Sequence, residues 1–122
     1  WDYKAMIEMM TLYLTSFYVA EADGRIIGFS AGAIEDTDEE KYGHVCNIAV
    51  TPEMRGFGIG RLLLRKVERD FFLEGCRACS LEVRKSNTNA HGFYERLDYE
   101  DVLVFGGYYS DGEDAIVMMR WF

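Results

Sequence analysis

The chain has 122 residues, of which 49% are hydrophobic and 15% aromatic, enough for one domain, residues 1–122, with a core of its own. Its formal net charge of −8 disfavours nucleic acid as a partner and is compatible with a cationic substrate. The chain shows neither an apolar run long enough to span a membrane nor a basic-then-apolar signal segment, so we expect a cytoplasmic protein without membrane contact.

In chain order, apolar residues at helical spacing predict one amphipathic helix over residues 2–14. The dipeptide Asp23-Gly24 then separates two β-rich segments, residues 17–20 and 26–29. This dipeptide between strands is a strong local signal for a hairpin. An acidic loop leads from the hairpin to a third predicted strand, residues 42–50.

A glycine-punctuated loop, residues 55–60, follows the apolar run Ile48-Ala49-Val50 and precedes a helix expected from residue 59 to a cap at Gly75. Such a loop binds anions well, because glycines bring backbone N–H groups close to a ligand and the helix start offers unpaired donors. Residues 55–69 also hold a cluster of basic residues and one acidic residue, Glu68. The basic residues are Arg55, Arg61, Arg65, Lys66 and Arg69. A solvated helix face is the other explanation of this cluster.

The rest of the chain predicts a strand over residues 79–84, a helix capped by Ser86 or Asn87, and two closing strands, around residues 102–105 and 115–121. The predicted order is therefore α-β-β-β-α-β-α-β-β. It indicates the α/β (α+β) class, with helices flanking a mixed, mostly antiparallel sheet.

Three cysteines, an odd number, suit a reducing compartment better than a disulfide framework. Cys76 and Cys79 form a C-x-x-C pair, which alone could be half of a zinc site or a redox pair. Because no second such pair and no His pair accompanies it, we expect buried or half-buried reduced thiols, with Cys46 among them, and no metal.

Two common phosphate-binding motifs do not fit the glycine loop. A P-loop requires G-K-[ST], whereas Gly60 is followed by Arg61-Leu62. A dinucleotide fold requires its glycines in a parallel βαβ unit, whereas these follow a predicted antiparallel hairpin. The pattern that remains is R-x-x-G-x-G, from Arg55 to Gly60.

With this loop after an N-I-A-V strand, the sequence resembles the GNAT acyltransferases. Three later segments look like the RimI/Ard1 group, which acetylates the α-amino group of protein N-termini, in the case of RimI on a ribosomal protein. These segments are L-E-V-R-K-S-N, F-Y-E-R-L-D-Y and Y-Y-S-D-G-E-D-A-I-V-M, at residues 81–87, 93–99 and 108–118. The resemblance implies a GNAT fold, but the chain opens with what looks like the family's second helix. We therefore expect the usual first strand and helix to be missing from it.

The resemblance further implies an acetyl-CoA-dependent N-acetyltransferase that transfers acetyl directly, within a ternary complex, to a protein or peptide N-terminus. In the family, the loop N–H groups bind the pyrophosphate and the preceding strand pairs with the pantetheine arm. Arg65 or Lys66 would meet the 3′-phosphate. The expected cofactor-binding residues are Ile48, Ala49, Val50, Arg55, Gly56, Phe57, Gly58, Ile59, Gly60, Arg61, Asn87 and Tyr94.

The same resemblance implies roles in catalysis and acceptor binding. Glu82 is expected to be the general base, through a water, unless it is an ordinary outward strand residue. Tyr94 is expected to protonate the leaving thiolate, unless it is only a core aromatic. His44 and His91 are alternatives to Glu82. Tyr108 and Tyr109 are expected to hold the acceptor backbone, or else to cover the sheet edge.

Two other functions fit these motifs: a GNAT acting on a small amine or a lysine side chain, and a non-catalytic acyl-CoA-binding module. The oligomeric state is open, a monomer included. One departure from the family pattern is Asp98, which stands where relatives usually have glycine. If this residue is left-handed, aspartate costs about 1 kcal/mol over glycine.

Overall fold

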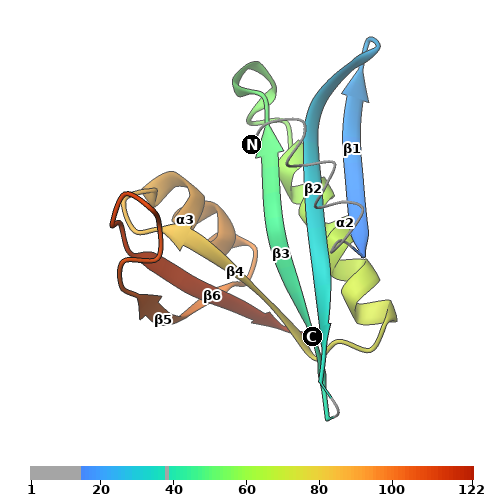
Figure 1. The fold of residues 1–122 in the computed structure, drawn as a ribbon. Helices are drawn as coiled ribbons and strands as arrows, with labels where there is room; N and C mark the ends of the chain where they lie inside the picture. Colours follow the sequence, from blue (N-terminus) through green and yellow to red (C-terminus); the bar gives the residue numbers. More distant parts are fainter. Residues whose placement is uncertain (1–14, 38) are drawn as a thin grey trace.

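The structure, a computed structural model, describes residues 15–37 and 39–122, so the helix expected over residues 2–14 lies outside the described part. Six strands form one sheet in the order β1-β2-β3-β4-β6-β5 (Figure 1). All neighbouring strands are antiparallel except β3 and β4, which are parallel. The strands are β1 (Ser16–Ala22), β2 (Arg25–Asp36), β3 (Lys41–Val50), β4 (Ala78–Arg84), β5 (Glu100–Phe105) and β6 (Ala115–Trp121). The expected mixed, mostly antiparallel sheet is confirmed.

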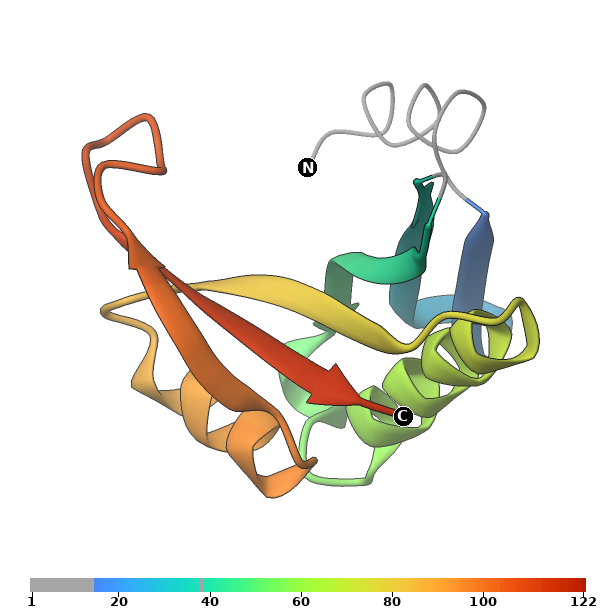
Figure 2. The ribbon, with the colours of Figure 1, turned by 90° about the horizontal axis from the view of Figure 1, so that it is seen from below.

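Two helices, α2 (Ile59–Leu73) and α3 (Thr88–Arg96), lie on the same face of the sheet (Figure 2), and a short 3₁₀ turn, η1 (Pro52–Met54), precedes α2. Leu64, Val67 and Phe71 of α2 are fully buried against the strands. A Cβ at Gly43 of β3 would lie 2.3 Å from Phe71 Cδ2, so glycine at this strand position makes room for the phenylalanine ring. Within the described residues, no helix is long and apolar enough to cross a membrane.

The hairpin turn and the helix cap that the sequence predicts are both present in the structure. Asp23 and Gly24 both have positive φ, 52° and 75°, as a two-residue type I′ hairpin turn requires. At the end of α2, Gly75 has φ 90° and its N–H donates to Phe72 O at 3.1 Å, while the Cys76 N–H donates to Phe71 O at 2.9 Å. This pair of bonds is a Schellman motif. The predicted cap at Gly75 is confirmed.

Asp98 ends α3 in the same way. Its φ is 74°, its N–H donates to Glu95 O at 3.1 Å, and the Tyr99 N–H donates to Tyr94 O at 3.1 Å. The left-handed conformation, which the sequence left open for Asp98, is present, at a position where glycine carries no Cβ penalty.

We therefore expect Asp98→Gly to stabilise the protein by up to about 1 kcal/mol, partly offset by the greater freedom of glycine in the unfolded chain. Urea unfolding followed by circular dichroism measures the change. Asp98→Ala is the matched control and should lower stability, since alanine keeps the Cβ and loses the local hydrogen-bonding ability of aspartate. A glycine variant no more stable than the alanine variant would contradict this account.

The sheet divides between β3 and β4. Their pairing covers only Tyr42↔Ala78, Gly43↔Cys79 and His44↔Ser80, and beyond these the strands diverge (Figure 1). A β-bulge begins at the same place, because Ala31 of β2 pairs with Asn47 and Gly32 with Val45, which leaves Cys46 as the extra residue. Residues 47–50 consequently have no strand partner on the β4 side in the described structure.

Candidate active site

A cavity of about 570 Å³ opens at this divergence, with walls from the end of β3, the loop before α2, and α3. All the cofactor residues expected from the sequence line it except Phe57, whose side chain is 73% exposed. Other lining residues were missed by the sequence reasoning: Met54, Asn89, Ala90, Phe93 and Arg96. The helical spacing of residues 89, 93 and 96 puts them on one face of α3, and this signal could have found them.

The glycine loop leaves backbone donors free at one end of the cavity. Gly56 and Gly58 have positive φ, 88° and 80°, and Gly58 is the N-cap of α2. Leu62 is the first residue of α2 whose N–H finds a helical acceptor, Gly58 O at 3.1 Å. Among the described residues, the N–H groups of residues 59–61 have no helical acceptor and are available to a ligand, at the positive end of the helix dipole. A phosphate-sized anion fits this environment.

Three arginines supply the cationic groups of the cavity: Arg55, Arg61 and Arg96. The expectation for Arg65 or Lys66 at the 3′-phosphate is not supported. Arg65 Nη1 binds the buried Glu68 Oε1 at 2.7 Å, and Lys66 Nζ lies 5.7 Å from the centroid of the Tyr18 ring. Arg65 is thus bound within the fold, Lys66 is exposed, and neither lines the cavity, whereas Arg96 is the lining cation that the sequence reasoning overlooked.

Asn87 and Tyr94 reach the cavity from α3. Asn87 Oδ1 accepts the Ala90 N–H at 3.1 Å, so its capping role is confirmed. Tyr94 is only 8% exposed, and its ring packs edge-on against Phe93 and Tyr99, with centroids 5.1 and 5.7 Å apart. Burial raises the pKa of the Tyr94 hydroxyl. The hydroxyl is therefore protonated at neutral pH and can serve as a proton donor.

A second group of polar residues lies on the sheet face opposite the helices. Leu81 and Val83 of β4 are buried on the helix side, so Glu82, between them, points to the other face. Glu82 Oε2 lies 2.7 Å from His44 Nε2, and His44 Nδ1 lies 3.7 Å from Cys46 Sγ. The structure thus joins Glu82 to His44, one of its two alternatives, at the point where β3 and β4 diverge.

Hydrogen bonds to Cys46 and to Glu82 raise the pKa of His44 to about 10, against the opposing effect of burial. At neutral pH the imidazole is then a cation and cannot accept a proton. Within this pair, the carboxylate of Glu82 is the group that can act as a base.

The raised pKa of His44 makes stability depend on pH. A group that binds its proton more tightly when folded contributes fully below its unfolded pKa, about 6.5, and loses that contribution as pH rises through its folded value. We expect the stability difference between the wild type and His44→Gln to be largest near pH 6 and to shrink toward pH 10. Urea unfolding of both proteins across this range measures it. A difference that is constant with pH would contradict a protonated His44.

The tyrosines expected to bind the acceptor lie in the loop between β5 and β6. The rings of Tyr108 and Tyr109 pack edge-on, with centroids 5.0 Å apart, and Tyr108 is 45% exposed. The negative charge of Glu82 is the main cause that raises the pKa of Tyr108. Arg84, two residues after Glu82 in β4, has its guanidinium carbon 4.0 Å from the Tyr109 ring centroid, and Tyr108 packs on Phe105 of β5, so the pair lies over the sheet face that carries the predicted base and beside the edge strand.

His91, the other alternative to Glu82, is engaged elsewhere. Its Nδ1 lies 3.1 Å from Glu95 Oε1 and its Nε2 lies 2.7 Å from Asp101 Oδ1, so it ties α3 to β5. It does not line the cavity. Cys76 and Cys79 are buried free thiols and Cys46 is a half-buried one, as expected from their number and spacing.

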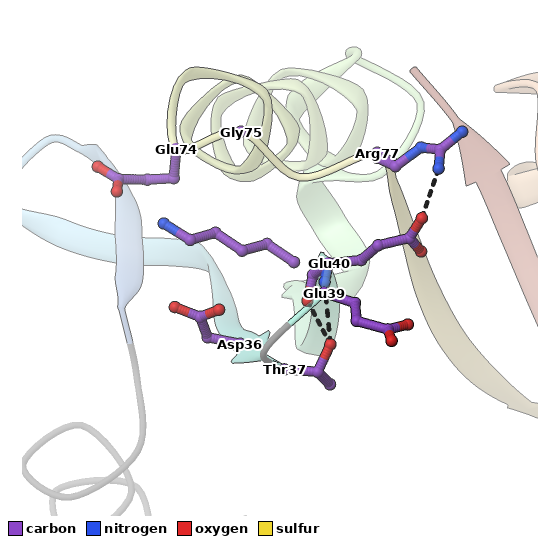
Figure 3. Close-up of a pocket in the computed structure, with 8 residues that line it drawn as sticks. Asp36, Thr37, Glu39, Glu40, Glu74, Gly75 and Arg77 are labelled. Carbon is purple, nitrogen blue, oxygen red and sulfur yellow. Dashed lines mark hydrogen bonds and ion pairs between the residues drawn. The ribbon is translucent and has the colours of Figure 1, made fainter.

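A second hollow, of about 490 Å³, lies at the other end of β3, where the acidic residues between β2 and β3 face the end of α2 (Figure 3). Arg77 is paired with Glu40 there. The hollow shares no lining residue with the cofactor cavity.

Comparison with known proteins gives one family match, two similar sequences and one similar structure. The sequence pattern of the acetyltransferase (GNAT) family matches residues 2–99. An uncharacterized N-acetyltransferase of Methanocaldococcus jannaschii is 42% identical over 111 residues, 90% of this chain and 69% of that protein. An N-alpha-acetyltransferase of Sulfurisphaera tokodaii is 35% identical over 129 residues, 97% of this chain and 76% of that protein. Among solved structures, Naa20 of Chaetomium thermophilum in complex with a bisubstrate analogue superposes with a TM-score of 0.91 at 27% identity, covering 100% of this chain and 74% of that one.

Proposed function

Because the chain belongs to the acetyltransferase (GNAT) family, we propose that it transfers the acetyl group of acetyl-CoA to the α-amino group of a protein N-terminus. Family membership makes it an acetyl-CoA-dependent acyltransferase. The observation that carries the proposed acceptor is the position of Glu82, bound to His44 where β3 and β4 diverge and on the sheet face where Arg84, two residues further along β4, contacts Tyr109. The sequence similarity of the chain to an N-alpha-acetyltransferase supports the same acceptor class.

The residues present fit acetyl-CoA. The N–H groups of residues 59–61, with Arg55 and Arg61, suit the pyrophosphate, and the edge of residues 47–50 that has no strand partner on the β4 side suits the amide-bearing pantetheine arm. Arg96 is the further cation available to the phosphates. When bound, the cofactor supplies an acetyl thioester, whose carbonyl carbon is the electrophile.

The side chains divide the proton transfers between them. Glu82 takes the proton of the attacking amine, through a water, so that the nitrogen can form its bond to the acetyl carbon. The imidazolium of His44 holds the Glu82 carboxylate in place. Tyr94 gives its hydroxyl proton to the departing sulfur. Tyr108 and Tyr109 hold the peptide backbone through their hydroxyl groups. The transfer is direct, within a ternary complex, and a ribosomal-protein N-terminus is one acceptor within this class.

Three acceptor panels incubated with acetyl-CoA test this proposal: peptides with free N-termini, N-terminally blocked peptides that contain lysine, and small amines. We expect CoA release and the gain of one acetyl group on the free N-termini. Acetylation restricted to lysine or to small amines would refute the proposed acceptor class, whereas the assignment as an acetyltransferase would stand. Binding of acetyl-CoA without modification of any acceptor would overturn the catalytic roles.

A further inference from the structure

The side chain of Arg84 contacts the tyrosine loop at three points. It follows Glu82 by two residues in β4 and so lies on the same face of the sheet. Its guanidinium carbon stands 4.0 Å from the centroid of the Tyr109 ring, and its Nη1 donates to Asp111 Oδ2 at 2.8 Å and to Glu113 Oε2 at 3.1 Å. The planar cation thus stacks on one loop residue and pairs with two more.

Besides Arg84, the described contacts at the tip of this loop are the packing of Tyr108 on Phe105, with ring centroids 5.4 Å apart, and bonds within the loop itself. None of residues 106–114 is buried, and Gly107 and Gly112 have positive φ, 62° and 88°. The base of the loop is fixed to the segment after β4, since Glu113 Oε1 accepts the Ser86 N–H at 2.8 Å and Asp114 O accepts the Lys85 N–H at 3.0 Å. Within the tip, the Tyr109 N–H donates to Glu113 O at 3.1 Å. Among the described side chains of the sheet, Arg84 is the one that donates a hydrogen bond to Asp111 and also stacks on the Tyr109 ring.

We propose that Arg84 is a positioning residue for the acceptor: by clamping Tyr109 and Asp111 it holds the Tyr108–Tyr109 pair over the face that carries Glu82. This inference rests on the proposed function, because it assigns Arg84 to the acceptor half of that site. Arg84 does not line the cofactor cavity. Loss of the Arg84 side chain should therefore weaken binding of the acceptor peptide and leave binding of acetyl-CoA unchanged.

Steady-state kinetics of three variants test the clamp. Arg84→Gln removes the charge and the stacking, and we expect the KM for an N-terminal peptide to rise about tenfold, with the KM for acetyl-CoA within about twofold of the wild type. Arg84→Lys keeps the charge but not the planar stacking, and should restore about half of the lost peptide affinity on a logarithmic scale. Arg77→Gln is the matched control, because Arg77 is also paired with a carboxylate but sits at the distant acidic hollow (Figure 3).

Hydrogen exchange gives a readout that does not depend on turnover. We expect the amides of Tyr109 and Gly112 to exchange faster in Arg84→Gln than in Arg77→Gln, because both amides donate within the loop tip, to Glu113 O and Tyr109 O. Unchanged exchange at these amides overturns the clamp. A parallel rise in both KM values, together with a lower Tm, also overturns it, since it would show a general structural role.

The two proposals fail separately in these experiments. A wild-type protein that binds acetyl-CoA but acetylates no peptide refutes the proposed function. Hydrogen exchange in the Arg84 variants still decides whether this side chain holds the tyrosine loop. If peptides are acetylated and Arg84→Gln leaves the peptide KM unchanged, the clamp is refuted and the proposed function stands.

Discussion

Glu82→Gln should lower kcat for peptide acetylation by about 10²–10⁴-fold, the usual contribution of a general base. The amide has nearly the shape of the carboxylate and can still contact His44, but it cannot take a proton from the amine. Because Glu82 does not line the cofactor cavity, the affinity for acetyl-CoA should be retained. Steady-state kinetics with saturating peptide, together with calorimetric titration of CoA, separate the two effects.

Glu100→Gln is the matched control, since Glu100 is an exposed strand carboxylate on β5 and its removal changes net charge by the same amount. This control should keep wild-type kinetics. A Glu82→Gln protein with near-normal kcat would remove Glu82 from the base role, and the proton would then have to leave by water or another group.

Glu68→Gln should destabilise the protein by about 3 kcal/mol, because it breaks a buried ionic cluster by removing one partner. Glu68 is 3% exposed, and its carboxylate accepts bonds from Arg65 at 2.7 Å, Arg120 at 3.1 Å and the Tyr99 hydroxyl at 2.6 Å. Two guanidinium groups would lose their only shared negative charge. Since these contacts join α2, β6 and the segment between α3 and β5, we expect the loss to lower the stability of the whole fold.

Urea unfolding measures this loss, and Glu74→Gln, just past the last residue of the same helix and exposed, serves as the control with little expected change. A Glu68→Gln protein as stable as the control would mean that the cost of desolvating the cluster cancels its attraction.

Much of the fold follows from signals that act over a few residues. The hairpin at Asp23-Gly24, the cap at Gly75 and the strained cap at Asp98 could be predicted because each depends on the backbone preferences of one or two residues. The cofactor loop could be predicted for the same reason, since its residues follow one another in sequence between a strand and a helix.

The rest of the site depends on contacts between distant segments. His44 and Glu82 are 38 residues apart, and their contact depends on how β3 and β4 pair before they diverge, which neither strand encodes alone. The bulge at Cys46 is likewise set by the register with β2. The sequence made Arg65 a candidate phosphate ligand, because it does not show that Glu68 is buried. In the structure, the buried Glu68 carboxylate pairs with Arg65.

Because of the divergence of β3 and β4, we expect the stability of the folded chain to depend on the ligand bound between these strands. On the β4 side, the backbone of residues 47–50 has no strand partner in the described structure, and β3 and β4 join the two halves of the sheet through three residue pairs. A ligand that binds there only in the folded state stabilises that state by mass action. Resistance of the chain to proteolysis should therefore rise and fall with the supply of acetyl-CoA, independently of any acceptor.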